Sequence, residues 1–119
     1  MIVAVVVPAE ASGSLSGAAD IRDLDVIGVQ YPATWVNAKL SFQVSDDGAT
    51  YKDLYDDNGT EAQVAGAANA DRFIGFRGDL AFILGRWNFI KVRSGLTGAH
   101  VDQTTDRTIN LIVKSRVAR

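Results

Sequence analysis

Hydrophobic and polar positions alternate most clearly in residues 39–61, the stretch around which the rest of the chain is organised. In residues 40–45, Leu, Phe and Val alternate with Ser, Gln and Ser, which is the period-two pattern of a half-buried strand. An Asp-Asp-Gly turn and an Asp-Asp-Asn-Gly turn separate this run from two further runs, residues 50–55 and 60–64. The pattern predicts a meander of three strands.

Residues 21–30 are the next strand candidate, and strict alternation places Val26 and Val29 on opposite faces of it. Gly28 interrupts the run and indicates either a bulge or the close approach of another backbone segment.

The second half of the chain predicts a short strand at residues 71–76, a strand at residues 87–93 and a last strand at residues 104–114. Residues 78–85 are apolar but too short to be assigned to a helix or a strand by period alone. The inward-facing positions of the strongest runs give the expected core: Leu40, Phe42, Val44, Ile90, Val92, Leu111 and Val113.

The N-terminal run, residues 2–7, is apolar at every position. It is shorter than a signal-peptide core and far shorter than a membrane-spanning helix. Two interpretations stay open: it is the first strand of its own sandwich, or it is an arm that docks on a neighbouring subunit. We expect residues 1–19 to form this apolar arm with a Gly/Ser/Ala connector, residues 20–115 the β-sandwich domain, and residues 116–119 a basic tail.

Short strands, frequent turn signals and the lack of a persuasive amphipathic helix together predict an all-β protein. We expect an antiparallel β-sandwich of jelly-roll type with about seven or eight strands and no helix longer than two turns. A small barrel is the alternative architecture.

Composition narrows the function classes. The 119 residues carry a net charge of −2, which disfavours nucleic acid as a partner. No apolar segment is long enough to span a membrane, so we expect no membrane partner either. The chain has no cysteine and a single histidine, His100, which excludes disulfides, thiolate metal sites and histidine pairs. Neither a nucleophile-elbow pattern nor a phosphate-binding glycine motif is present. We therefore expect no enzymatic activity and no cofactor.

Two charged clusters are candidate binding sites. The acidic cluster consists of Asp46, Asp47, Asp53, Asp56, Asp57 and Glu61. Calcium favours carboxylates on turns, but the spacing fails the helix-loop-helix calcium pattern, so ordinary turn chemistry is the preferred interpretation and no metal is expected.

The second cluster is a basic strip on the expected last strands. It comprises Lys91, Arg93 and Arg107. We expect these side chains to pair with Asp102 and Asp106 on an outward face; a contact surface for an acidic partner is the alternative.

Four short motifs carry a resemblance to a known family. They are W-x-x-A-x-L-x-F-Q-V-S-x-D-G, L-Y-D-x-x-G, K-x-R-S-G and Q-x-x-D-R, which occupy positions Trp35, Ala38, Leu40, Phe42, Gln43, Val44, Ser45, Asp47, Gly48, Leu54, Tyr55, Asp56, Gly59, Lys91, Arg93, Ser94, Gly95, Gln103, Asp106 and Arg107. Over residues 21–115 the chain resembles small virion-associated structural proteins of tailed bacteriophages and prophages. In architecture it also resembles discoidin-like jelly rolls.

The first resemblance implies a capsid decoration (cement) protein on the outer surface of the phage head, made in the bacterial host cytoplasm. It implies the major capsid protein and sister copies as partners, with a homo-oligomer such as a trimer. A head-fibre or tail component is an alternative. The residues expected to contact a partner are Ile2, Val3, Val5, Val7, Trp35, Phe76, Phe82 and Trp87. A carbohydrate-binding module, stacking sugars on Tyr31, Trp35 or Trp87, is a further alternative.

Overall fold

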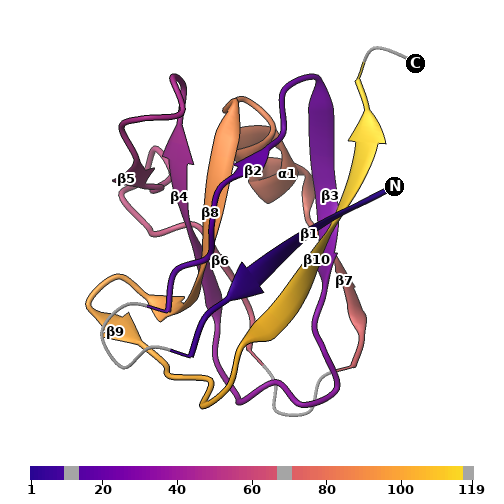
Figure 1. Cartoon of the computed structure of the whole chain (residues 1–119). Coiled ribbons are helices and arrows are strands. Elements are labelled where there is room, and N and C mark those ends of the chain that lie inside the picture. Colours follow the sequence, from indigo (N-terminus) through magenta and orange to yellow (C-terminus); the bar gives the residue numbers. More distant parts are fainter. Residues whose placement is uncertain (10–13, 67–70, 117–119) are drawn as a thin grey trace.

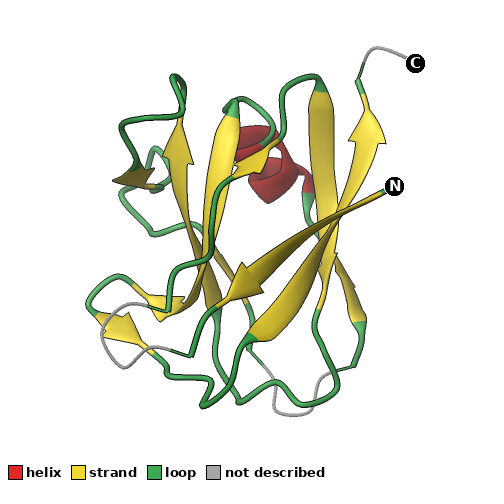
Figure 2. Ribbon diagram, in the orientation of Figure 1, coloured by secondary structure: helices red, strands yellow, loops and turns green. Residues whose placement is uncertain are grey.

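The computed structural model describes residues 1–9, 14–66 and 71–116. Within this part of the chain, period-two segments form ten strands, and one short apolar segment forms a helix (Figures 1 and 2). The elements are β1 (Ile2–Val7), β2 (Ala19–Asp20), β3 (Leu24–Gln30), β4 (Leu40–Ser45), β5 (Lys52–Asp53), β6 (Gln63–Val64), β7 (Phe73–Gly75), α1 (Gly78–Leu84), β8 (Phe89–Leu96), β9 (Ala99–His100) and β10 (Arg107–Ser115).

The strands form two antiparallel sheets that enclose one hydrophobic core. One sheet has the order β1-β10-β3-β7, and the other has the order β2-β8-β4-β5. In the second sheet β6 also pairs with β4, and β9 pairs with β8. The predicted all-β sandwich is therefore confirmed.

The pairing of the strands is that of a jelly roll. β5 and β6 lie along the same edge of β4, and β9 is the return arm of a hairpin with β8, so the ten strands fill eight positions. The first position then pairs with the last (β1 with β10), the second with the seventh (β2 with β8), the third with the sixth (β3 with β7) and the fourth with the fifth (β4 with β5). This is one long hairpin wrapped into two Greek keys.

Alternation along the strands determines which side chains are buried. All seven residues expected in the core are at most 4% exposed. β10 contributes Ile109 on the same face as Leu111 and Val113, as its period-two pattern requires. The core prediction is confirmed.

A β-bulge changes the faces of β3. The register of β3 with β10 shifts between Ile112 and Val113, and Val26 and Val29 are consequently both fully buried. Their expected placement on opposite faces was wrong because the bulge adds one residue to the alternation. Gly28 lies at this point, and a Cβ there would sit 2.7 Å from the carbonyl oxygen of Ile74. Both the bulge and the close approach predicted for Gly28 are confirmed.

The N-terminal segment is the first strand of its own sandwich. β1 pairs with β10 from Ile2 to Val7, and the Val5 and Val7 side chains are buried in the core. The interpretation as an arm that leaves its own domain is thereby corrected. Residues 10–13 of the expected connector lie outside the described residues. Its next part runs along β8, because Ser16 donates to Val92 O at 2.7 Å and Ser94 donates to Ser14 O at 2.9 Å.

The expected three-stranded meander is only partly formed. β5 pairs with residues 43–44 of β4, whereas β6 pairs with residues 40–41 of β4 and not with β5. A loop closed by a bridge between Tyr55 and Glu61 separates the two short strands. The first strand of the meander, residues 40–45, is confirmed at its predicted bounds.

The ambiguous apolar segment at residues 78–85 is helix α1, whose seven residues make just under two turns. β8 begins at Phe89 and continues to Leu96, so the strand expected at residues 87–93 starts two residues later and ends three residues later than predicted. No helix in the described ranges is long and apolar enough to cross a membrane.

The first residue of the expected basic tail, residues 116–119, is held by the fold. Arg116 donates to the carboxylate of Asp25 at 3.1 Å and to the carbonyl oxygens of Leu24 and Gly85. Residues 117–119 lie outside the described part of the chain.

Candidate functional site

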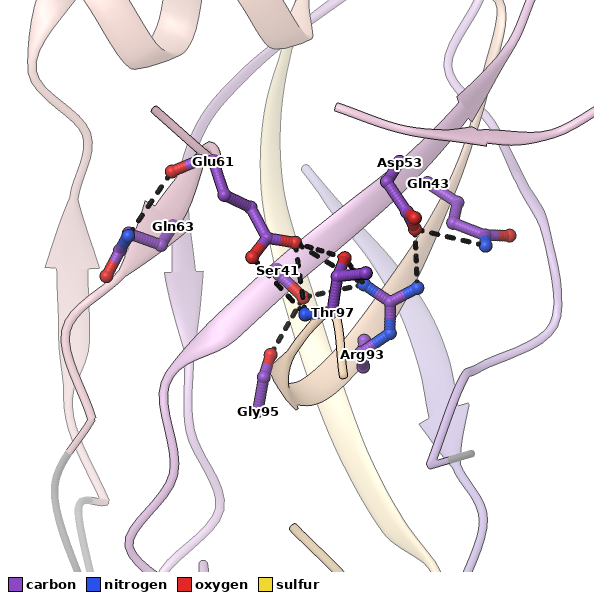
Figure 3. Close-up of polar contacts among 8 residues, drawn as sticks. All are labelled: Ser41, Gln43, Asp53, Glu61, Gln63, Arg93, Gly95 and Thr97. Atoms are coloured by element: carbon purple, nitrogen blue, oxygen red, sulfur yellow. Dashed lines mark hydrogen bonds and ion pairs between the residues drawn. The ribbon is translucent and has the colours of Figure 1, made fainter. Parts of the chain in front are cut away.

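A buried arginine organises the outer face of the β2-β8-β4-β5 sheet (Figure 3). The Arg93 guanidinium donates from Nη2 to Asp53 Oδ1 at 2.6 Å, and from Nη1 to Ser41 Oγ at 3.0 Å and Thr97 Oγ1 at 2.9 Å. Glu61 Oε2 lies 3.6 Å from Nη1 and accepts from the Thr97 hydroxyl at 2.5 Å. Arg93 is only 8% exposed, so the charge is compensated inside the fold.

This network gives Arg93, one residue of the basic strip, a structural role. The hydrogen bond from Arg93 lowers the pKa of Asp53, which keeps the carboxylate ionised beside the guanidinium. The expected pairing with Asp102 and Asp106 was wrong for Arg93; Asp106 instead accepts from the Ala9 N–H at 3.0 Å. The Lys91 ammonium lies 4.3 Å from the centre of the Tyr51 ring.

The acidic turns use their carboxylates to hold their own backbone. Asp47 accepts from the N–H groups of Thr50 and Ala49, each at 2.9 Å, and from the Ser45 hydroxyl at 3.0 Å. These bonds, that from Thr50 first, lower the pKa of Asp47 to about 2.

Asp56 plays the same part in the second turn, where it accepts from the N–H groups of Asn58 and Thr60. These bonds support the turn-chemistry interpretation of the acidic cluster. Among the residues that the structure describes, no group of three or more histidine, aspartate or glutamate side chains is placed to hold a metal ion.

Two aromatic residues considered for ligand contact belong to the core. Trp35 is 1% exposed and Tyr31 fully buried, with their ring centres 5.2 Å apart. The indole N–H donates to Ala38 O at 3.0 Å, and the Tyr31 hydroxyl donates to Ala65 O at 2.8 Å. Burial raises the pKa of the Tyr31 hydroxyl. Because both rings are buried, the predictions that Trp35 contacts a partner and that either ring stacks on a sugar were wrong.

The remaining residues expected to contact a partner differ in exposure. Ile2 and Phe82 are exposed, Val3, Phe76 and Trp87 are half-buried, and Val5 and Val7 are buried. They come from different elements, because Ile2 and Val3 belong to β1, Phe76 follows β7, and Phe82 lies on α1. Phe82 and Trp87 line the same hollow.

Phe82 and Trp87 line a groove to which Tyr55 contributes a third ring. The hollow has a volume of about 430 Å³, and Leu54 and Ile83 complete its apolar lining. It adjoins a hollow of about 580 Å³ along β4 and β5, and the two share Asp46, Leu54, Tyr55 and Trp87. We call this surface, formed by Leu54, Tyr55, Phe82, Ile83 and Trp87, the aromatic groove.

Charges of both signs surround the aromatic groove. Arg86 lies over the Phe82 ring, with its guanidinium carbon 4.3 Å from the ring centre. Asp46 lies beside both hollows, and Lys52 and Asp53 line the larger one.

Sequence reasoning placed Tyr55 at the end of the expected strand at residues 50–55 and not at a contact surface. It is 48% exposed, whereas its neighbour Leu54 is 5% exposed. Side chains alternate between the two faces of a strand, so an inward-facing Leu54 indicates that Tyr55 faces outward; this was the signal in the sequence.

Comparison with known proteins adds no further guide to this surface. No protein-family model matches the chain, and no curated protein or solved structure is significantly similar to it.

Proposed function

We propose that this chain is a structural protein of a bacteriophage virion that decorates the outer surface of the capsid and binds the major capsid protein through the aromatic groove. The observation that carries the proposal is the exposure of Tyr55 and Phe82 beside Trp87 and Arg86 on a jelly-roll scaffold. The motif resemblance to virion proteins of tailed phages supplies the class of partner.

The composition of the groove supports binding to a protein. Tyrosine, tryptophan, phenylalanine and arginine are enriched in protein interfaces, and tryptophan, tyrosine and arginine dominate their hot spots. Here Tyr55 and Phe82 are 48% and 60% exposed, so both would lose water-exposed apolar area on binding. The surrounding Asp46 and Lys52 provide a polar rim.

The groove is also held in place by the fold. Asn88, next to Trp87, donates from its side chain to Asp46 O at 2.9 Å and from its backbone to Ser45 O at 3.2 Å. These bonds fix the segment between α1 and β8 against the end of β4. A surface that is already ordered loses little conformational entropy on binding, which suits a protein attached in many copies.

The test uses phage heads purified after deletion of the gene for this chain. Purified protein is added back, and binding is measured by co-sedimentation and by the temperature at which the heads release DNA. We expect saturable binding and a higher release temperature, both lost with Phe82→Asp and Trp87→Ala. The matched control is Phe73→Asp, because Phe73 is 68% exposed but lies on β7, outside the groove.

Each other outcome counts against the proposal. Equal loss with Phe73→Asp would exclude the groove as the docking site, and no binding to heads would exclude decoration. Recovery of the native chain in tail or fibre fractions would assign it to that part of the virion.

A carbohydrate-binding module is the second candidate, favoured by Trp87 lying in one hollow with Asp46. A half-buried ring beside a carboxylate can stack on a sugar and accept from its hydroxyls. Calorimetric titration with bacterial surface polysaccharides tests it. Binding that Trp87→Ala abolishes, together with no affinity for heads, would favour this candidate.

A further inference from the structure

The edges of the two sheets are unequally protected against pairing with another chain. Among the described residues, the edge strand β7 has three residues, and β2, β5 and β6 have two each. β1 is the exception, with six residues at the edge of the β1-β10-β3-β7 sheet. Short edge strands are one of the ways in which proteins prevent edge-to-edge pairing, and β1 lacks that protection.

The register of β1 shows which backbone groups face outward. Val113 N donates to Met1 O at 3.0 Å, so these two residues form a hydrogen-bonded pair in the β1–β10 register. Antiparallel strands alternate between bonded and non-bonded pairs. Val3, Val5 and Val7 therefore direct their backbone N–H and C=O groups toward β10, and the intervening residues direct theirs away from it.

The outward-facing residues Ile2, Ala4 and Val6 also have exposed side chains. Ile2 is 54% exposed and Val6 is 49% exposed. Charged residues, prolines and bulges usually blunt such an edge, but residues 2–7 contain no charge and no proline, and their register with β10 is unbroken. Within the described part of the chain, β1 thus presents backbone groups that pair with no strand, together with apolar side chains.

We infer that two copies of this chain associate through β1, antiparallel and related by a two-fold axis at Ala4. In that register Ala4 lies opposite its own copy, and Ile2 lies opposite Val6. Three hydrogen-bonded pairs then form, which is about six backbone hydrogen bonds. The two four-stranded sheets become one sheet of eight strands.

A second copy fits this edge because the edge is complementary to itself. Large apolar side chains flank a small one, so each Ile2 meets a Val6 and the central alanines leave room at the axis. The β10 residues registered with positions 2–6, residues 108–112, carry no charge either. Like charges are therefore not brought together. The inference is independent of the proposed function, since β1 contributes nothing to the aromatic groove.

Sedimentation equilibrium of the intact chain over a range of concentrations is the first test. We expect a reversible equilibrium between the monomer of 12.7 kDa and a dimer. Val6→Lys should raise the dimer dissociation constant at least tenfold, because it replaces the apolar contact with Ile2 of the second copy and puts a charge on the paired edge. Thr108→Lys is the matched control: Thr108 is the register partner of Val6 and is exposed, but it lies on β10, inside the sheet.

Ala4→Pro separates backbone pairing from apolar contact. The Ala4 N–H is not used in the β1–β10 ladder, so proline there removes only the intermolecular bond. We expect this variant to be folded by circular dichroism and monomeric by sedimentation equilibrium.

Thiol crosslinking then tests the register in a chain without native cysteine. Ala4→Cys places the two thiols across a hydrogen-bonded pair whose Cα atoms are about 5.5 Å apart. Val6→Cys places them four residues out of register, about 14 Å apart along the strand. A short bis-thiol reagent should crosslink the first variant at least tenfold faster than the second.

Three results would overturn the inference. The first is a monomer at millimolar concentration, and the second is equal crosslinking of both cysteine variants. The third is equal disruption of the dimer by Thr108→Lys and Val6→Lys, which would indicate that sheet faces pack together.

Discussion

The Arg93 guanidinium on β8 donates to the carboxylate of Asp53 on β5 at 2.6 Å, across the intervening strand β4. Ser41 of β4 accepts from the same guanidinium midway. A single side chain therefore ties three neighbouring strands together on the outer face of the sheet. Because β5 has only two residues, this side-chain bond supplements a short backbone ladder.

Removing the guanidinium should destabilise the fold strongly. We expect Arg93→Ala to lower the free energy of unfolding by about 3–5 kcal/mol, because Glu61 and Asp53 lose the charge that compensates them. Urea denaturation monitored by tryptophan fluorescence measures the change. Arg22→Ala is the control: Arg22 pairs with Asp20 at the same 2.6 Å, but its side chain is 59% exposed to solvent, so a much smaller loss is expected. Equal losses in the two variants would contradict the structural role of Arg93.

Phe42 fills the core between the sheets and is fully buried. Phe42→Ala should cost about 3–5 kcal/mol, the sum of lost apolar burial and the cavity left behind. Phe73→Ala, at a position 68% exposed, should change stability by about 0.5 kcal/mol or less. A loss below about 1 kcal/mol for Phe42→Ala would show that its side chain is not packed as described.

β3 and β7 approach closely, so we expect alanine substitutions at the paired residues Gly28 and Gly75 to affect stability differently. A Cβ at Gly28 would lie 2.7 Å from Ile74 O, a backbone atom that moves only if β7 shifts. Gly28→Ala should therefore destabilise by about 1–3 kcal/mol. Gly75 is paired with Gly28, but a Cβ there meets no atom of the described residues within 4 Å, so Gly75→Ala should be neutral or slightly stabilising. The melting temperatures of both variants measure these effects. A lower melting temperature for Gly75→Ala would argue against the described register.

The acidic turns predict a loss of stability in acid. The pKa of Asp47 is lowered from 3.8 to about 2, so its contribution is fully present above pH 4 and is lost as the pH falls through 2. We expect the melting temperature to fall over this range, and to fall less in Asp47→Asn. Asp57→Asn, an exposed carboxylate of the second turn, is the control and should behave like the native chain. An unchanged slope in Asp47→Asn would refute the assignment.

Local patterning was sufficient for the long strands and their buried faces. Leu40, Phe42 and Val44 follow a period of two without interruption, and side chains in a strand alternate whatever its partner is. The same holds for Ile109, Leu111 and Val113 in β10. These runs identified the sandwich and part of its core.

Features that depend on distant segments could not be predicted in this way. The bulge that turns Val26 and Val29 to the same face is fixed by the register with β10, more than 80 residues later. Arg93 finds its partners Asp53 and Glu61 on a segment whose path is set by β4. The aromatic groove likewise joins Tyr55 to rings about 30 residues away, which no period reveals.

The pairing of β1 with β10 has a consequence for how the chain reaches its native state. Ile2 lies opposite Ile112, so β1 can form its backbone hydrogen bonds only after β10, far along the chain, has been synthesised. Closing so long a loop is entropically unfavourable, and domains dominated by such distant pairings fold slowly. During synthesis on the ribosome, the valine-rich strand β1 therefore emerges before its partner β10 and remains unpaired until β10 follows. Chaperone capture in this interval, or exchange of the strand between two unfinished molecules, would act on residues 2–7 before any other part of the sandwich.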